Sequence, residues 1–202
     1  VVTAADREIE QFLGQTFDRP EESSYLLGEE TIASRPEEYL QMAMQARDCW
    51  IVDPIDGTAP YTAHIPTWGI SIGHMSRGRI DNGAIYLPEY DQLLITEGED
   101  IVEYSNLKTA TPSRKKLHVT IPPLESLLPV GVPQDLAKHG RIDFDNAVFV
   151  WCAFVATFHA LLHGKLQCYI VSAKLWDVAA ALAMLQRTNL FSLGCSSRRK
   201  FQ

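Results

Sequence analysis

Two aspartates lie three positions apart in the segment DPIDGT, residues 53–58. The apolar residues 50–52 precede them and are typical of the end of a buried strand. Such a strand would hold Asp53 and Asp56 at the edge of a sheet, where the carbonyl of Ile55 could face the same point. The segment alone allows two interpretations, a solvated loop that ends the strand and a cation site.

The two residues after the second aspartate add the features of an anion site. Gly57 lets the backbone approach a ligand closely, and the N–H groups of Gly57 and Thr58 can face an anion at the start of a helix. The hydroxyl of Thr58 can orient a water molecule. Asp56, Gly57 and Thr58 therefore predict a cradle for a phosphate group, with metal ions on its carboxylate side.

Further acids occur where other elements are expected to begin or end. Glu29 and Glu30 follow the apolar residues 25–27, and Asp177 lies at the start of an expected helix. Open α/β sheets gather their ligand sites at the carboxyl ends of strands, so we expect these acids to meet the two aspartates. Converging carboxylates cannot all stay ionised without a cation. Oxygen ligands without histidine or cysteine favour magnesium, manganese or calcium.

Four short motifs of the chain resemble the inositol monophosphatase-like family. They are VTAAD at 2–6, GEE at 28–30, DPIDGT at 53–58 and WDVAA at 176–180. The resemblance covers nearly the whole chain and implies a magnesium-dependent, lithium-sensitive phosphomonoesterase. Relatives act on fructose bisphosphate, adenosine 3′,5′-bisphosphate and histidinol phosphate. The family's first helix and much of its final αβ segment have no counterpart, so we expect the chain to be incomplete at both ends.

The resemblance also implies a role for each matching residue. The implied metal ligands are Glu29, Asp53, Asp56 and Asp177, together with the backbone carbonyl of Ile55. Thr58, supported by Asp6, would orient or deprotonate the attacking water, and Glu30 would support the metal ligands. The implied cofactor is Mg²⁺, as two or three ions, with Mn²⁺ as an alternative.

Three of these acids also have ordinary structural interpretations. Asp6 is typical of a charge near a helix N-terminus, and Asp177 of a helix cap. Glu30 is nearly as typical of a structural partner as of a group beside a metal. Only their occurrence together with residues 53–58 favours the functional interpretation.

The part of the chain expected to contact the alcohol differs from the family pattern. Residues 59–61 are Ala-Pro-Tyr, where the family usually continues with a small residue and Asn-Phe. Residues 149–154 are bulky and apolar where the family has small and polar residues, and Ile170 falls near a family glutamate. We expect an apolar wall that cannot pair with the hydroxyls of a polyol. This wall argues against inositol phosphate as the substrate. The aromatic rings of Trp151 and Phe154 would instead suit a nucleotide base.

The elements that must position these residues alternate between helices and strands. We expect helices over 3–13, 36–47, 146–163 and 176–187, and strands over 25–27, 50–53, 68–75, 79–87, 92–96 and 166–171. The stretch 99–136 has no readable pattern. The alternation predicts an α/β (α+β) layered sandwich. The resemblance implies the inositol monophosphatase and fructose bisphosphatase type, with alternating helix and sheet layers.

Length and composition fit one domain of an ordinary globular protein. The chain has 202 residues and a formal net charge of −7, so we expect one domain with two subdomains, about 1–115 and about 116–202. The acidic balance argues against nucleic acid as a partner, and no stretch is apolar enough to span a membrane. Four scattered cysteines indicate reduced thiols in the cytoplasm. The basic cluster 198–200 is expected to be a solvated tail.

These observations lead to two hypotheses of different classes. The first is a magnesium-dependent phosphomonoesterase for a small phosphorylated metabolite, of the inositol phosphate or sugar phosphate class. Within that class, a 3′(2′),5′-bisphosphate nucleotidase-like specificity is the alternative. The second is a family member that binds metal or a phosphorylated ligand without turnover. The resemblance also raises the expectation of a homodimer, because relatives are often dimers.

Overall fold

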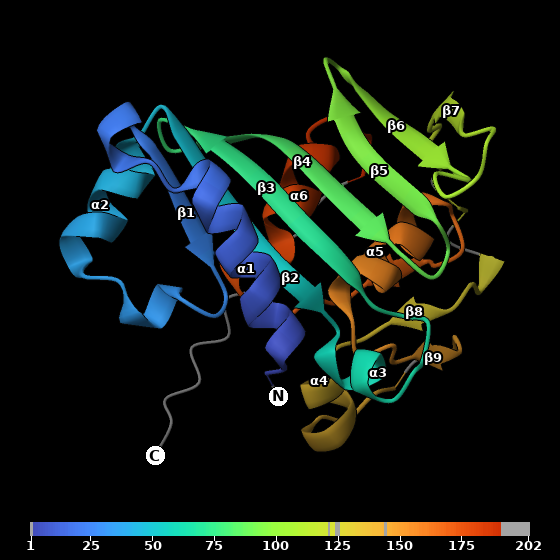
Figure 1. The fold of residues 1–202 in the computed structure, drawn as a ribbon. Coiled ribbons are helices and arrows are strands. Elements are labelled where there is room, and N and C mark those ends of the chain that lie inside the picture. Colours follow the sequence, from blue (N-terminus) through green and yellow to red (C-terminus); the bar gives the residue numbers. More distant parts are fainter. Residues whose placement is uncertain (1, 121, 124–125, 144, 191–202) are drawn as a thin grey trace.

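The structure is a computed structural model that describes residues 2–120, 122–123, 126–143 and 145–190 (Figure 1). A seven-stranded sheet forms its centre, in the order β1-β2-β3-β4-β5-β6-β7. Its strands are β1 Ser24–Gly28, β2 Asp48–Asp56, β3 Gly69–Ser76, β4 Arg79–Leu87, β5 Gln92–Glu97, β6 Asp100–Ser105 and β7 Ser113–Lys116. Only β1 and β2 are parallel; the other neighbours are antiparallel.

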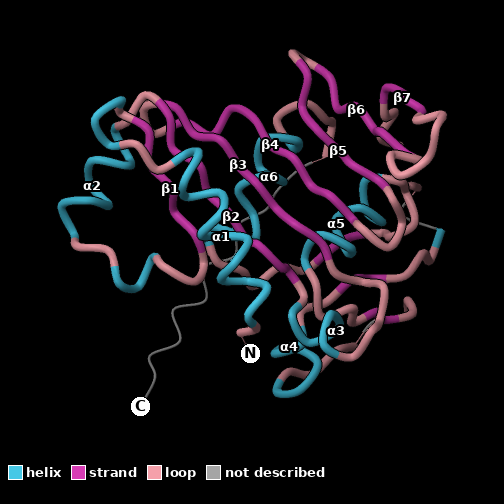
Figure 2. Tube along the Cα trace, viewed as in Figure 1, coloured by secondary structure: helices cyan, strands magenta, loops and turns pink. Residues whose placement is uncertain are grey.

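A smaller sheet and six α-helices complete the described part of the chain (Figure 2). The second sheet is parallel, in the order β10-β8-β9, with strands β8 Val130–Gly131, β9 Val148–Phe149 and β10 Cys168–Tyr169. The helices are α1 Ala4–Phe17, α2 Glu37–Gln45, α3 Thr58–Thr62, α4 Gln134–His139, α5 Phe154–Leu162 and α6 Leu175–Leu185. Two short 3₁₀ turns, η1 Pro20–Glu22 and η2 Ile32–Ser34, flank β1.

The helices and sheets form alternating layers. Helix α1 crosses one face of the large sheet, and α6 lies against the opposite face (Figure 1). Helix α5 packs beside α6 on that second face and contacts β10 of the small sheet. The main core lies between the large sheet and these two helices and contains Ile85, Leu94, Val155, Leu162 and Met184, each fully buried. This is the layered α/β sandwich expected from the sequence.

The contact between α6 and the large sheet is unusually close because it is built from the smallest residues. A Cβ atom added at Gly73 of β3 would lie 2.5 Å from the Cβ atom of Ala179. One added at Gly83 of β4 would lie 2.5 Å from the carbonyl oxygen of Ala180. Both glycines lie inside strands, as expected for Gly83, and they allow the helix backbone to approach the sheet directly. We call these four residues the glycine–alanine seam.

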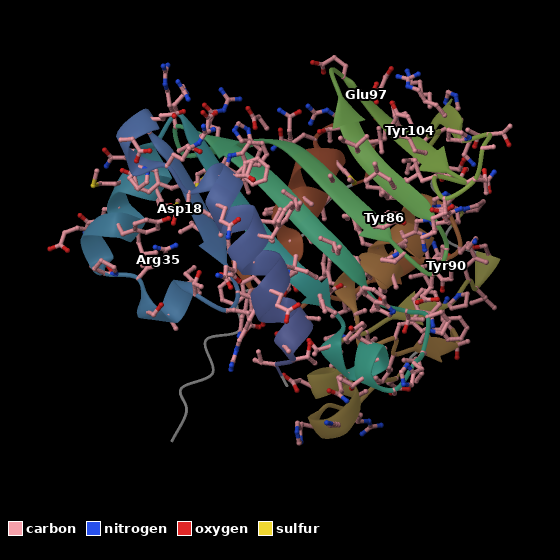
Figure 3. All side chains as sticks on the ribbon, in the orientation of Figure 1. Asp18, Arg35, Tyr86, Tyr90, Glu97 and Tyr104 are labelled. Atoms are coloured by element: carbon pink, nitrogen blue, oxygen red, sulfur yellow. The ribbon has the colours of Figure 1, made fainter. Side chains whose placement is uncertain are left out.

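The two edge strands of the large sheet differ in what lies against their outer edges. At β1, the backbone N–H of Leu26 donates to the hydroxyl of Tyr39 from α2, at 3.1 Å. Tyr39 in turn donates to Asp18, which also pairs with Arg35 at 2.6 Å; Asp18 and Arg35 are labelled in Figure 3. At the other edge, all four residues of β7, Ser-Arg-Lys-Lys, are exposed.

Several expected element boundaries are wrong. The helix expected over 3–13 continues to Phe17 in α1. The stretch 99–136, which had no readable pattern, contains β6, β7, β8 and part of α4. The expected helix over 146–163 is a helix only from Phe154, because residues 148–149 pair with β8 as a strand.

Some sequence expectations concern residues beyond these elements. The basic cluster 198–200 and Cys195 lie outside the described residues. Cys49, Cys152 and Cys168 are free thiols. Among the described residues, every helix is too short or too polar to cross a membrane.

The seam predicts a large cost for a single added methyl group. Gly83→Ala should lower the free energy of unfolding by about 1–3 kcal/mol, because the new atom overlaps the backbone of α6. Gly14→Ala is the matched control, since nothing lies within 4 Å of its added Cβ atom. Inside helix α1 that change should instead stabilise by about 0.5–1 kcal/mol. Urea unfolding measures both, and equal effects would contradict the close contact.

Candidate functional site

Asp53 lies near the end of β2, where the pairing with β3 becomes irregular. The register between these strands shifts between Asp53 and Asp56, so the intervening residues do not pair regularly. The backbone N–H of Ile55 donates to Oδ1 of Asp53 at 3.0 Å. Asp53 is only 2% exposed, so its carboxyl group is held in the interior at the strand end.

Asp56 connects the end of β2 to the start of α5. Its Oδ2 atom accepts a short hydrogen bond from the backbone N–H of Val155, in the first turn of that helix. The first N–H groups of a helix have no partner within the helix, so the carboxylate satisfies one of them. Asp56 is 7% exposed, and this contact spans nearly a hundred residues of sequence.

Asp177 approaches the same point from α6. Its Oδ2 atom accepts a hydrogen bond from the backbone N–H of Lys174 at 2.7 Å, which caps the helix. The cap expected for Asp177 is therefore present, but it does not use up the carboxyl group. Asp53, Asp56 and Asp177 each offer a carboxylate oxygen, and these oxygens lie within 4.8 Å of one another. We call these three residues the acidic cluster.

The acidic cluster is electrostatically strained when no cation is bound. Burial, and then the neighbouring charge of Asp56, raise the pKa of Asp53 far above its ordinary value. Burial also raises the pKa of Asp56, although hydrogen bonds from the α5 backbone oppose it. Burial and the charge of Asp177 raise the pKa of Glu29, which places this glutamate within electrostatic reach of the cluster. A divalent cation would favour the ionised form of all four groups.

This donor set fits a hard divalent cation. The acidic cluster and Glu29 present only oxygen atoms, which are the ligands of magnesium, calcium and manganese. The expected metal ligands with side-chain oxygens are thus close together in the fold. Their role as ligands, and that of the Ile55 carbonyl, stays a prediction.

Two further acids, Asp6 and Glu30, lie near Glu29. Asp6 of α1 is 1% exposed and accepts hydrogen bonds from both the N–H and the hydroxyl of Thr3. Burial, followed by the charges of Asp6 and Glu29, raises the pKa of Glu30. Asp6 therefore combines the expected position near a helix N-terminus with proximity to the acidic residues after β1.

Glu10 is a positioning residue that the sequence reasoning missed. It is 2% exposed, and its carboxylate accepts hydrogen bonds from the N–H of Glu30, at 2.9 Å, and from the hydroxyl of Thr31. These contacts fix the loop that carries Glu29 and Glu30. The signal was present, because Glu10 follows Asp6 by four positions and shares its helix face.

Gly57 and Thr58 form the turn from β2 into α3. Gly57 has φ of 88°, and an added Cβ atom would lie 2.7 Å from the Cβ atom of Ala153, so only glycine fits. The hydroxyl of Thr58 donates to the carbonyl of Ile55 at 3.2 Å. In the described part of the chain, Thr58 and Asp6 are not hydrogen-bonded to each other. Their joint action on a water molecule stays a prediction.

A cavity of about 240 Å³ opens beside the acidic cluster. Asp56 and Asp177 line one side of it, and polar groups of Gln134, Thr157, Tyr169 and Ser172 are among the rest of its lining. The expected apolar wall is therefore wrong in part, since α5 contributes Thr157 and the small sheet contributes Tyr169. Phe154 also lines the cavity and packs on Tyr169 with ring centroids 5.4 Å apart, whereas Trp151 is not part of the lining.

Comparisons with known proteins agree with this geometry. Residues 1–188 match the model of the inositol monophosphatase family. The chain is 25% identical to an inositol-1-monophosphatase of Mesorhizobium japonicum over 204 aligned positions, which cover 94% of this chain and 70% of that one. It is 31% identical to inositol monophosphatase 1 of Homo sapiens over 86 positions, which cover 43% of this chain and only 30% of the human protein.

The fold is also that of a solved structure. A crystal structure of 2′AMP-bound SaIMPase-II superposes with a TM-score of 0.68 over 93% of this chain and 71% of the other. The two sequences are 20% identical, so this likeness concerns the fold.

The acidic cluster predicts a metal-free protein that is less stable at higher pH. Because the folded pKa of Asp53 is raised, the folded state binds more protons than the unfolded state above about pH 4, and stability falls as the pH rises. Asp53→Asn should therefore stabilise the metal-free protein by roughly 1–3 kcal/mol more at about pH 8 than at about pH 5. Unfolding with a chelator present measures this difference.

A surface aspartate provides the control for this prediction. Asp100→Asn removes an exposed ion pair with Lys116 and should change stability by less than about 0.5 kcal/mol at either pH. Added Mg²⁺ should stabilise the wild type and Asp100→Asn but not Asp53→Asn. An effect of Asp53→Asn on the metal-free protein that is the same at both pH values would refute the repulsion argument.

Proposed function

The chain belongs to the inositol monophosphatase family, and we propose that it is a Mg²⁺-dependent phosphomonoesterase that acts on a small phosphorylated metabolite. One observation carries this proposal. Two residues of the buried acidic cluster, Asp56 and Asp177, line a cavity that is large enough for a small ligand and has other polar residues in its lining. Buried carboxylates at such a distance need a cation, and the cavity gives the cation a ligand to act on.

We assign the metal to Glu29, Asp53, Asp56, Asp177 and the carbonyl of Ile55. Two or three Mg²⁺ ions, with Mn²⁺ as an alternative, would supply positive charge for the phosphate oxygens and for the attacking water. The chain supports this by holding each aspartate with a backbone N–H group, so that the carboxylates are oriented before a ligand arrives.

The remaining residues position the water and the phosphate. We propose that Thr58 receives the attacking water, because its hydroxyl lies beside the carbonyl of Ile55 within the same turn. Asp6 and Glu30 would support this group from the α1 side through the charge they add around Glu29. The N–H groups of Gly57 and Thr58, with Asp56, would hold the phosphate, for which the glycine leaves the backbone accessible.

The side chains that line the cavity would select the part of the substrate to which the phosphate is attached. Thr157, Tyr169 and Ser172 offer hydroxyl groups that can pair with the hydroxyls of an inositol phosphate or sugar phosphate. A phosphate bound at Asp56 would place the alcohol part of the substrate between α5 and β10, where these hydroxyl groups lie. The proposal includes lithium inhibition, a cytoplasmic location, a homodimer and subdomains of about 1–115 and 116–202, each carried over from the family resemblance or the composition.

A second candidate substrate class is a nucleotide phosphate. It is favoured by the paired aromatic rings of Phe154 and Tyr169 in the cavity, since such rings can stack on a base. The 2′AMP complex of the similar SaIMPase-II adds support. If no substrate of either class is hydrolysed, the remaining interpretation is that the protein binds a phosphorylated ligand without turnover.

The role of Thr58 is tested by a pair of threonine substitutions. Thr58→Ala should reduce Mg²⁺-dependent phosphate release by roughly 10²–10⁴-fold, because the water loses its orienting hydroxyl. Thr62→Ala is matched, since Thr62 donates to the carbonyl of Ala59 in the same helix at 3.0 Å but lies at its exposed end. Thr62→Ala should keep wild-type activity, and Thr58→Ser should keep most of the activity that Thr58→Ala loses. Equal losses in both alanine variants would overturn the assignment.

The substrate class is tested by a panel of inositol, sugar and nucleotide phosphates with and without Mg²⁺. Phe154→Leu should lower kcat/KM for a nucleotide by about 10-fold, the value of one stacking contact of about 1.4 kcal/mol, and leave sugar phosphates nearly unchanged. The reverse selectivity would favour the polyol class. Thermal stabilisation by the panel without phosphate release would contradict an enzymatic function.

A further inference from the structure

A second group of titratable side chains is buried away from the acidic cluster. Glu103 of β6 is 1% exposed, His159 of α5 is 6% exposed, and His163 directly follows α5. Each offers one ligand atom, and the three atoms lie within 4.8 Å of one another. The proposed phosphatase reaction uses none of these residues.

The position of Glu103 is one that a core sheet would normally give to an apolar residue. In the register of the sheet, Glu103 pairs with Leu94, which pairs with Ile85, and these two neighbours belong to the main core under α5. His159 and His163 lie four positions apart and so project from one side of the helix toward this row. A carboxylate and two imidazoles thus replace apolar packing at one place in the core.

The hydrogen bonds orient His163 toward the carboxylate. Its Nδ1 atom lies 2.8 Å from the carbonyl oxygen of His159, so Nδ1 carries the proton and donates it. Its Nε2 atom then faces Oε2 of Glu103 at 2.6 Å. A histidine that ligates a metal typically donates its other ring N–H to a carbonyl in this way.

His159 has a nitrogen that these contacts leave unexplained. Its Nε2 atom is buried and has no hydrogen-bond partner among the described residues. Tyr90, labelled in Figure 3, lies near the ring, with centroids 6.2 Å apart, and the ring of His163 lies 4.1 Å away. A buried polar atom without a partner costs about 1–3 kcal/mol. A simple ion pair between His163 and Glu103 gives this nitrogen no partner.

The protonation states suit metal binding. Burial, followed by the nearby His163, lowers the pKa of His159 to about 3, so this imidazole is neutral at ordinary pH. Burial opposes ionisation of Glu103, but hydrogen bonds from Lys115 and His163 outweigh it and lower the pKa of this carboxyl group. A neutral imidazole and an ionised carboxylate are the forms that ligate metals.

We propose that Glu103, His159 and His163 bind one divalent transition-metal ion of the zinc class. Two imidazole nitrogens and one carboxylate oxygen form a donor set that zinc commonly uses. Zinc bonds of about 2.0–2.1 Å in a tetrahedron place ligand atoms about 3.3 Å apart, so the three atoms need only small side-chain shifts to enclose the ion. The fourth position of the tetrahedron is left to water.

Binding replaces a proton on His163. In the metal-free form Nε2 shares a proton with Glu103, and the ion takes the place of this proton, which is released to solvent. Lys115 stays on the other oxygen of Glu103, at 2.8 Å.

This site is distinct from the acidic cluster and goes beyond the proposed function. The N–H of Val155 in the first turn of α5 contacts Asp56, whereas His163 caps the other end of the same helix. Eight residues of helix separate these ends by about 12 Å. The ligand types also differ, because nitrogen donors favour zinc-class ions over magnesium.

The test measures zinc bound to the full chain while excess Mg²⁺ is present. After equilibrium dialysis against Zn²⁺, the wild type should hold one zinc ion. The affinity of His163→Gln for this ion should be at least about 100-fold weaker, so the variant should lose it. His74→Gln is the matched control, because His74 also lies between two carboxylates, Asp48 and Asp81. It should bind zinc like wild type.

A measurement on wild type keeps the proposal testable if the variant folds poorly. Anomalous scattering at the zinc edge from crystals soaked in Zn²⁺ should give a peak between β6 and α5, with two nitrogen ligands. A peak only at the acidic cluster, or equal zinc content in wild type and folded His163→Gln, would overturn the proposal. Because neither readout depends on phosphate release, failure here is separable from failure of the proposed enzymatic function.

Discussion

The close approach of α6 to the large sheet sets the geometry on which the site depends. Gly73 and Gly83 leave no side chain between the strands and the helix, so the backbone of α6 rests on the sheet itself. Asp177 lies only two positions before Ala179 of this seam. The carbonyl of Trp176 also accepts a hydrogen bond from the hydroxyl of Ser71 on β3. The packing of α6 on the sheet therefore positions the backbone that carries the third carboxylate of the cluster.

Each carboxylate of the cluster is held by the same kind of contact, a hydrogen bond from a backbone N–H group. Oδ1 of Asp53, Oδ2 of Asp56 and Oδ2 of Asp177 each accept one such bond, from Ile55, Val155 and Lys174 respectively. One oxygen of each carboxylate is thus fixed by the backbone. The like charges are brought together by the contact of β2 with the start of α5 and by the packing of α6 on the large sheet.

The sequence predicted the parts of this arrangement that depend on local chemistry. The segment DPIDGT located Asp53 and Asp56, although the expected strand stopped at Asp53 and β2 continues to Asp56. Asp177 was found as an acid at an expected helix start and through the resemblance of residues 176–180. Glu10 and the N–H of Val155 were missed, since their contacts join residues 20 and 99 positions apart. The apolar appearance of 149–154 was also misleading. The polar groups of the cavity come from Thr157, one turn further on, and from Tyr169 on a different element.

The contrast between the two edges of the large sheet affects how the protein behaves beside other copies of itself. An open edge strand presents unpaired backbone groups that can add a strand from a second molecule and begin aggregation. Leu26 in β1 has its outward N–H occupied by Tyr39, so one edge is closed by a side chain. In β7, Arg114, Lys115 and Lys116 each form an ion pair with an acid of the neighbouring strands, and all three are exposed, so an added strand would have to pack beside charged side chains. Edge-to-edge pairing of two large sheets is thereby disfavoured.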